Sequence, residues 1–495
     1  MTRAAPMDKP PVPTGRWLRL AAGVVFTGLL IWAPLNFGST RAGGTEWLTA
    51  GCTLATLLWL AAWVASGPRA PLPPGAVASV TLLTLAALPW ITGLARLTPM
   101  APFTSTHFAQ VAARWPYGIV WRTPDNTLPF ILALAAAALP LIDLARHRSW
   151  ALTFSIALTG TAVAVGLLAL LQNYTHAAGI YWRDDGRMPG HFCGTFFHHT
   201  AAGAYFNTAW PLAFALTWLA WDHDRPLARL PALALAGLVA VIVLLAAQGS
   251  HISRFPQVAA LLVAPFLFGS RKPTRRRHWI YLVGPAAAVG LLIAVAGRTT
   301  EIGERWQLMF TPAPAAPLVA QPAEALWPGL MRDDLFIAHD SQGGRLGDRG
   351  ESWRTALRCI ADRPFTGHGP GNWMGAASHH TADPFVRTFF QFLQFTHQDL
   401  LQFAVEWGVP ATLGWWGLLA GSIVMVGRAQ HWRSPLHRQL AIAAACGLAA
   451  VLLQSQGDFP LQMPAIALNA VVLAALGWAG AGGVPRRRPA PPPPA

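Results

Sequence analysis

Polar residues that could move protons or bind anions are concentrated between residues 349 and 411, just before a long apolar stretch. The strongest candidate is His397. A neutral imidazole can accept a proton from a hydroxyl near neutral pH, and the start of a helix disfavours its protonated form. His397 is therefore a candidate general base. Taken alone, it is more typical of a helix-capping histidine at a membrane surface.

Two arginines could bind an anionic group beside this histidine. Arg254 is expected at the outer end of one apolar stretch, and Arg349 precedes a short amphipathic segment. Taken alone, Arg254 is typical of an arginine whose side chain extends to the membrane surface. Arg349, taken alone, is typical of a solvated loop charge. Two guanidinium groups directed at one cavity could instead hold a pyrophosphate, because their planar donors pair with phosphate oxygens.

The residues after His397 predict a helix with two different faces. If the helix begins at His397, that residue shares a face with Leu401, Ala404 and Gly408. Three supporting residues, Asp399, Gln402 and Glu406, lie on the opposite face. Glu406 is therefore expected to anchor the helix against a neighbour and not to pair with His397.

The other histidines and the four cysteines give no metal signature. His191, His198 and His199 do not have the spacing of a helical metal pair, so His198 and His199 are interpreted as polar lining of an outer cavity. No CxxC motif occurs. We expect no metal and no cofactor. Cys52 and Cys446 are predicted in the core, whereas Cys193 and Cys359 lie in predicted outer loops, either as a disulfide or as free thiols.

The scaffold that must position these residues is a membrane domain. Hydrophobic residues make up 53% of the 495-residue chain and charged residues only 12%, whereas soluble domains are nearer a quarter charged. The sequence predicts an all-α polytopic membrane protein with about 12 transmembrane helices. The predicted spans are 16–37, 46–66, 75–96, 127–145, 149–172, 200–221, 230–248, 256–270, 279–297, 408–427, 438–456 and 461–482.

The charge distribution predicts the orientation. The net charge is +15, and the basic residues cluster in alternate loops, which by the positive-inside rule are cytoplasmic. Both termini are then cytoplasmic, and nucleic-acid binding is not expected because the clusters form no continuous basic stripe. The expected divisions are a disordered tail at 1–15, a transmembrane bundle at 16–297, a large periplasmic segment at 298–396, transmembrane helices at 397–482 and a Pro-rich tail at 483–495.

Within the large outer segment, residues 351–362 predict a short amphipathic helix. Trp353, Ala356, Leu357 and Ile360 share its apolar face. The sequence then turns sharply through Gly367, Gly369 and Gly371. This turn is expected to lie between the amphipathic helix and the helix that follows His397.

The motifs resemble the O-antigen ligase and polymerase superfamily of bacterial membrane glycosyltransferases. The family pattern His-[Asn/Ser/Gln]-x9-Gly-x-x-[Gly/Thr/Tyr] matches from His397-Gln398 to Gly408, with Ala411 at its last position. The segment from Arg349 through Asp362-Arg-Pro364 to Gly367-His-Gly-Pro-Gly-Asn372 is similar to a second family segment. Shorter similarities include Ser253-Arg254, Gly194 to Tyr205, and Asp458-Phe-Pro-Leu-Gln462.

The resemblance implies transfer of a glycan from a polyprenyl-diphosphate-linked donor to a hydroxyl of a lipid or glycan acceptor, without metal or nucleotide sugar. It implies that Arg254 and Arg349 bind the diphosphate and that His397 is the base, with Asp458 among the supporting residues. It further implies a bacterial inner-membrane protein, in contact with membrane lipids, whose site is periplasmic. Ligase and polymerase activities remain equal alternatives. Protein O-oligosaccharyltransferase activity, or transport of a lipid-linked saccharide without catalysis, are further alternatives.

Overall fold

The structure is a computed structural model of the whole chain, and the described residues are almost entirely helical. Cys193 and Phe196 form an isolated antiparallel bridge, and the described part contains no β-strand. The described residues are 14–41, 43–66, 71–99, 124–183, 193–221, 229–249, 254–269, 347–380, 394–429 and 431–481. The two predicted tails and the predicted span at 279–297 lie essentially outside these ranges.

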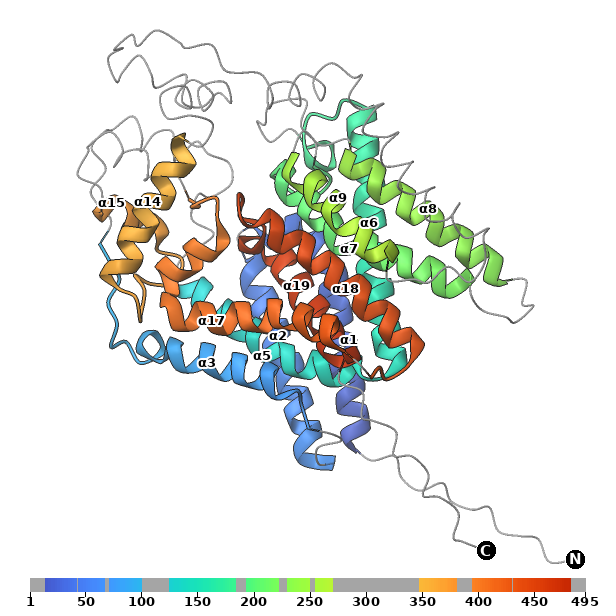
Figure 1. Cartoon of the computed structure of the whole chain (residues 1–495), viewed down its shortest axis with the longest axis horizontal. Helices are drawn as coiled ribbons and strands as arrows, with labels where there is room; N and C mark the ends of the chain where they lie inside the picture. The colour runs from blue at the N-terminus through green and yellow to red at the C-terminus, as the bar shows by residue number, and fades with distance from the viewer. Residues whose placement is uncertain are drawn as a thin grey trace, which may run out of the picture.

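The α-helices follow the apolar stretches of the sequence (Figure 1). In the first part of the chain they are α1 (Thr14–Leu35), α2 (Gly44–Ser66), α3 (Pro74–Ile91), α5 (Pro124–Ala145), α6 (Arg148–Tyr174), α7 (His199–Trp221), α8 (Arg229–Gly249) and α9 (Arg254–Gly269). In the second part they are α14 (Gly347–Asp362), α15 (Trp373–His379), α17 (Asp399–Arg428), α18 (Pro435–Gln454) and α19 (Pro464–Ala481).

The described part confirms a polytopic membrane protein. Nine of its helices are long and apolar enough to cross a membrane: α1, α2, α3, α5, α6, α8, α17, α18 and α19. At two further predicted spans, α7 is long but less apolar and α9 is short. The expected number of about 12 is therefore not established. The span predicted at 408–427 is longer than expected, because α17 begins at Asp399.

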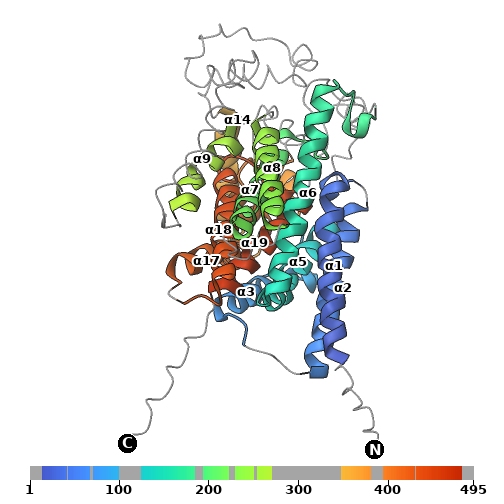
Figure 2. The ribbon, with the colours of Figure 1, turned by 90° about the vertical axis from the view of Figure 1, so that its right-hand side faces the viewer.

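Helix α19 is the centre of the bundle. Every residue from Pro464 to Ala481 is buried, as expected for a helix that is apolar on all sides. It contacts α18, α5, α17, α1 and α7, and Figures 1 and 2 show it among these helices. In Figure 1, α14 and α15 lie on one side of it and α6 to α9 on the other. Small residues permit the close approach: a Cβ added to Gly480 would lie 2.7 Å from Ala441.

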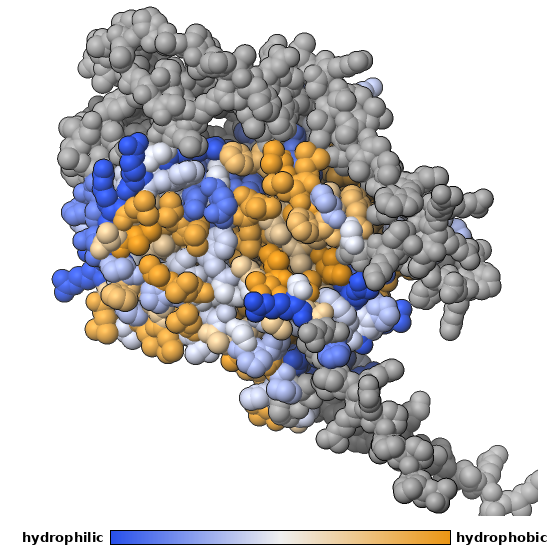
Figure 3. Space-filling view, viewed as in Figure 1, coloured by the Kyte–Doolittle hydropathy of each residue, from blue (hydrophilic) through white to orange (hydrophobic). Residues whose placement is uncertain are grey.

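The outer surface of the bundle is apolar, as a lipid-facing surface must be. Large hydrophobic side chains such as Val64, Leu85 and Phe266 are exposed. Figure 3 shows apolar residues covering much of the described surface on one face. Exposed apolar area this extensive is stable only against lipid or another apolar partner.

The two ends of the bundle differ in chemistry. At the end where α1 begins, buried Asp143 accepts a hydrogen bond from Trp59 Nε1 at 2.9 Å and lies 3.9 Å from Arg19 Nε. Arg146 and Arg433 also donate to backbone carbonyls there. At the other end of α1, Tyr181 donates to the Leu35 carbonyl at 2.7 Å. Arg19, Arg146 and Arg433 therefore lie at the same end of the bundle.

All four cysteines, Cys52, Cys193, Cys359 and Cys446, are buried and free. The possible Cys193–Cys359 disulfide is therefore not formed, and free thiols, the other alternative, are present.

Candidate active site

Helix α17 is broken one third of the way along its length, and this break shapes the site. Gly408 has φ 80° and ψ 167°, which is not helical. Pro410, two residues later, has no N–H to donate. The carbonyls of Val405 and Glu406 instead accept hydrogen bonds from the backbone N–H groups of His368 (2.7 Å) and Gly369 (3.0 Å). The break in α17 is therefore filled by the glycine turn.

The glycine turn and α17 fit so closely that side chains are excluded at the contact. Gly367 has φ 69°, and a Cβ added there would lie 2.5 Å from the backbone of Glu406. A Cβ on Gly408 would lie 2.4 Å from the Phe365 carbonyl oxygen. Val409 N–H also donates to the Pro364 carbonyl at 2.7 Å. These contacts give a physical reason for the glycines in both motifs.

Glu406 and Gln402 link α17 to the segments around the site. The Glu406 carboxylate accepts hydrogen bonds from Gly371 N–H and from Gln402 Nε2, each at 3.0 Å. Gln402 Oε1 accepts from Thr396 N–H at 3.1 Å, next to His397. Both side chains are buried. Both side chains therefore anchor α17 to neighbouring segments, as expected for Glu406.

His397 lies just outside α17, and the prediction that it opens the helix is wrong. Gln398 is the N-cap, and its side-chain oxygen accepts from Leu401 N–H at 2.6 Å. His397 itself has φ 54°, a left-handed conformation that is uncommon for a residue other than glycine. The chain therefore turns at His397, and the shared face with Leu401, Ala404 and Gly408 does not apply.

The imidazole of His397 packs against an aromatic ring and faces a carboxylate. Its ring centroid lies 4.9 Å from that of Phe459, edge to face. Nδ1 lies 4.0 Å from Asp458 Oδ1, and it is buried without a hydrogen-bond partner in the described part of the chain. The His397 side chain is 23% exposed and the Asp458 side chain 3%. The ring therefore has a buried side toward Asp458 and an accessible side.

Arg349 reaches this group from α14. Its guanidinium carbon lies 5.4 Å from the centroid of Phe255, at the start of α9. Phe255 in turn packs on Gly457, where an added Cβ would lie 2.7 Å from the ring. Gly457 directly precedes Asp458. The N-terminal ends of α14 and α9 therefore meet at the segment that carries Asp458.

The positive charge of Arg349 acts on His397. Burial lowers the pKa of His397 below its ordinary value of 6.5, and Arg349 lowers it further. Asp458 opposes this shift, and His198 adds a smaller lowering effect. The imidazole is therefore neutral at physiological pH and can accept a proton.

Arg254, the third predicted site residue, is the first residue of α9. Its backbone position is adjacent to Phe255, which contacts Arg349. Its side chain lies outside the described structure. The described geometry thus brings together His397, Arg349 and the backbone of residue 254.

The predicted histidine pair lies beside the site. His198 stacks on His199, with centroids 4.6 Å apart, and its ring lies 5.4 Å from Phe459. His198 Nδ1 is 2.6 Å from Thr200 Oγ1. His198 thus shares Phe459 with His397. Residue 191 lies outside the described ranges.

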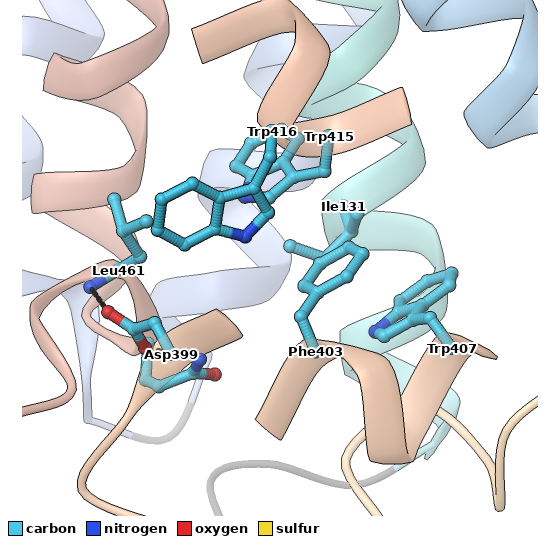
Figure 4. Close-up of a pocket in the computed structure, with 8 residues that line it drawn as sticks. Ile131, Asp399, Phe403, Trp407, Trp415, Trp416 and Leu461 are labelled. Carbon is cyan, nitrogen blue, oxygen red and sulfur yellow. Dashed lines mark hydrogen bonds between the residues drawn. The ribbon is translucent and has the colours of Figure 1, made fainter. Parts of the chain in front are cut away.

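Asp399 positions the segment that carries Asp458. Its carboxylate accepts from Leu461 N–H at 2.9 Å and from Gln462 Nε2 at 2.6 Å. Figure 4 shows Asp399 at the edge of a small pocket whose aromatic lining comes from α17. Those lining residues are Phe403, Trp407, Trp415 and Trp416.

Two features of the site were not predicted. Phe459 is the central ring of the group, stacked on Phe395 at 4.1 Å and flanked by His198 and His397. Ser352 of α14 donates to the Thr396 carbonyl at 3.3 Å and so joins α14 to the residue before His397. The sequence signal for Phe459 was its place in the family-like segment Asp458-Phe-Pro-Leu-Gln462.

The amphipathic helix is present as α14, but its buried face differs from the expected one. Ser352, Ala356 and Cys359 are fully buried, whereas Leu357 is 57% exposed. Inclusion of Leu357 in the apolar face was therefore wrong. The small residues face inward because α14 packs closely on α17 and α15.

A comparison with known families gave a match over part of the chain. Residues 234–416 match the family model Wzy_C, described as O-Antigen ligase. The matched region contains Arg254, Arg349, His397 and Gly408. A comparison with curated proteins gave no match. The matched domain supports glycan transfer of the O-antigen ligase kind, with a lipid-linked glycan donor and a lipid or glycan acceptor in general terms. The match supports the resemblance of this integral membrane protein to the O-antigen ligase and polymerase superfamily.

Proposed function

We propose that this protein transfers a glycan from a polyprenyl-diphosphate-linked donor to a hydroxyl acceptor, with His397 as general base and Arg349 and Arg254 as diphosphate ligands. One observation carries the proposal. His397 is a neutral imidazole beside a buried carboxylate, and a guanidinium from another helix is near enough to lower its pKa. A base and an anion-binding group in one place are what this displacement requires.

The reaction is a single displacement at the anomeric carbon. The acceptor oxygen forms a bond to that carbon as the bond to the diphosphate oxygen breaks. The acceptor proton moves to Nε2 of His397, and the electron pair of the broken bond leaves with the diphosphate, whose charge the guanidinium groups stabilise. The configuration inverts. A positioned base of this kind contributes about 10²–10⁴-fold in rate.

Asp458 orients the base in this proposal. At 4.0 Å its oxygen is beyond hydrogen-bond distance from Nδ1, but such contacts are often long without substrate. When Nδ1–H donates to Asp458, Nε2 keeps its lone pair for the acceptor proton. The same carboxylate stabilises the imidazolium that forms. Asp458 is thus a positioning residue.

Arg349 couples donor binding to base strength. Its charge lowers the pKa of His397. A bound diphosphate would offset that charge, so the pKa of His397 would rise. His397 then becomes a stronger base only when the leaving group is present.

The orientation is also part of the proposal. Arg19, Arg146 and Arg433 lie at the end of the bundle opposite to His397. By the positive-inside rule that end is cytoplasmic. We therefore assign the inner membrane, cytoplasmic termini, and a periplasmic site that includes the outer segment 298–396. Labelling of Cys substitutions at exposed positions 431 and 354 by an impermeant reagent in whole cells tests this, since labelling at 354 but not 431 is expected.

The function is tested by reconstitution of the purified protein with a synthetic polyprenyl-diphosphate oligosaccharide and hydroxyl acceptors. His397→Ala, Arg349→Ala and Arg254→Ala should each reduce product by at least about 10²-fold. Two matched controls should keep activity. They are Arg354→Ala, at an exposed position of α14, and His431→Ala, at the opposite end of the bundle. Release of lipid diphosphate should match product one to one.

Two results would overturn the proposal. Full activity of His397→Ala would remove the base assignment. Movement of the intact lipid-linked donor across the vesicle membrane, without any cleavage of the diphosphate bond, would instead indicate a transporter.

A further inference from the structure

Four side chains with metal-binding atoms converge where α14, the glycine turn and α15 meet. Sγ of Cys359 and one ring nitrogen each of His368 and His380 all lie within 4.8 Å of one another. Asp362 Oδ2 lies 3.7 Å from His368 Nε2 and 3.4 Å from His380 Nε2. Cys359 and His368 are fully buried, and the His380 side chain is 15% exposed. The Asp362 side chain is 53% exposed, so the thiol and the two imidazoles are shielded from solvent, whereas the carboxylate side of the cluster is open to it.

The second nitrogen of each histidine is held by a polar partner. His380 Nδ1 donates to the Ala376 carbonyl at 2.9 Å, which leaves a lone pair on Nε2. His368 Nδ1 lies 2.6 Å from Thr98 Oγ1, and its Nε2 lies 2.8 Å from the Cys359 carbonyl. Because a carbonyl can only accept, Nε2–H of His368 donates to Cys359 in this structure. Metal binding through Nε2 requires the other tautomer, in which Nδ1–H donates to Thr98 and the Nε2 lone pair turns from the carbonyl to the ion. Such outer hydrogen bonds orient histidines that bind metals.

We propose that Cys359, His368 and His380 bind a divalent transition-metal ion of the zinc type, with Asp362 as the fourth ligand. One thiolate, two imidazoles and one carboxylate form a tetrahedral set that suits Zn²⁺ or Co²⁺. Mg²⁺ and Ca²⁺ are disfavoured because they require oxygen ligands. Bonds of about 2.0–2.3 Å place tetrahedral ligand atoms about 3.3–3.8 Å apart. The cluster must therefore contract by about 1 Å at its widest pair, which side-chain rotation can supply.

The place of the cluster in the fold indicates a structural role. Cys359 follows Arg349 by ten residues, which is about 15 Å along α14. The ion is thus remote from the reacting groups. Its ligands come from the end of α14, from the glycine turn and from the end of α15. His368 also donates its backbone N–H to the broken helix α17. A bound ion would fix α14, and hence Arg349, relative to α17.

Sequence spacing alone does not reveal this cluster. The ligands are separated by two, five and eleven residues, which matches no common metal motif. The proposal therefore departs from the expectation, drawn from the sequence, that the protein binds no metal. The alternative for the present cluster is a carboxylate that bridges two imidazoles without an ion.

Metal analysis of the purified full-length protein tests the proposal directly. Expressed with added Zn²⁺ and washed with metal-free buffer, the protein should carry about one zinc per chain. After chelation, Co²⁺ should restore about one equivalent. It should also give a near-ultraviolet thiolate-to-cobalt absorption band together with intense tetrahedral visible bands. A wild-type protein with less than about a tenth of an equivalent and no thiolate band would overturn the proposal, and this measurement requires no variant.

Matched variants identify the ligands. Cys359→Ser and His380→Ala should abolish the thiolate band or reduce bound metal to below about a tenth of an equivalent. Two control variants should retain the thiolate band and the bound metal. They are Cys446→Ser, at another buried cysteine, and His379→Ala, at the exposed neighbouring histidine. Equal metal content in all four variants would refute the assignment. Chelation should also lower the melting temperature of wild type but not of His380→Ala, a readout independent of glycan transfer.

Discussion

The junction between the glycine turn and α17 can be tested by one methyl group. Gly408 has φ 80° and ψ 167°, a region that is essentially restricted to glycine. Placing alanine there costs about 1–3 kcal/mol. The new Cβ would also lie 2.4 Å from the Phe365 carbonyl oxygen, so the two segments must separate. Loss of one junction hydrogen bond adds about 0.5–1.5 kcal/mol. We therefore expect Gly408→Ala to reduce the free energy of unfolding by about 2–4 kcal/mol.

The assay is unfolding of the purified protein in mixed micelles, followed by tryptophan fluorescence. Gly427→Ala is the matched control, because it lies on the same helix and its added Cβ meets nothing within 4 Å. It should be neutral or stabilising by up to about 1 kcal/mol. If Gly408→Ala unfolds with the same free energy as Gly427→Ala, the proposed close fit of turn and helix is wrong.

Three further outcomes follow from the site. Burial and Arg349 lower the pKa of His397 in the protein without donor, so the neutral base persists as the pH falls. The acid limb of the pH profile of kcat/KM for the donor should therefore lie below pH 6.5, and an acid limb above pH 6.5 would contradict this. Asp458→Asn removes the charge that raises the pKa of His397. It should therefore move the acid limb of the pH profile to still lower pH and reduce kcat by at least about tenfold. An unchanged pH profile and kcat would exclude the orienting role of Asp458. Glu406→Ala leaves the N–H of Gly371 and the amide of Gln402 without this acceptor. The free energy of unfolding in the micelle assay should therefore fall by about 2–4 kcal/mol. A decrease below about 0.5 kcal/mol would show that the anchor is unimportant.

Much of the fold could be predicted because bilayer thickness sets helix length. The apolar stretches at 46–66 and 149–172 correspond closely to α2 and α6. The exact count could not be predicted, since α7 carries polar residues within a buried helix and α9 is short. Length and hydropathy do not report on contacts that bury polar groups inside a bundle.

The candidate site was predictable in residue type but not in geometry. His397 and Arg349 could be identified from their chemistry and from family-like motifs. The turn at His397 could not be identified from the sequence, because it depends on Gln398 acting as the N-cap and on the hydrogen bond from Thr396 N–H to Gln402. The inward face of α14 was also misjudged, since close packing selected Ala356 and Cys359 over Leu357. Such choices arise from tertiary contacts, which periodicity does not encode.

The most direct test of the mechanism separates donor binding from chemistry. Protein loaded with lipid-diphosphate glycan is mixed rapidly with acceptor, and a single turnover is followed by quenching and mass spectrometry. His397→Ala should bind the donor as tightly as wild type but transfer glycan about 10²–10⁴-fold more slowly. A single-turnover rate equal to that of wild type would contradict the central claim that His397 removes the acceptor proton.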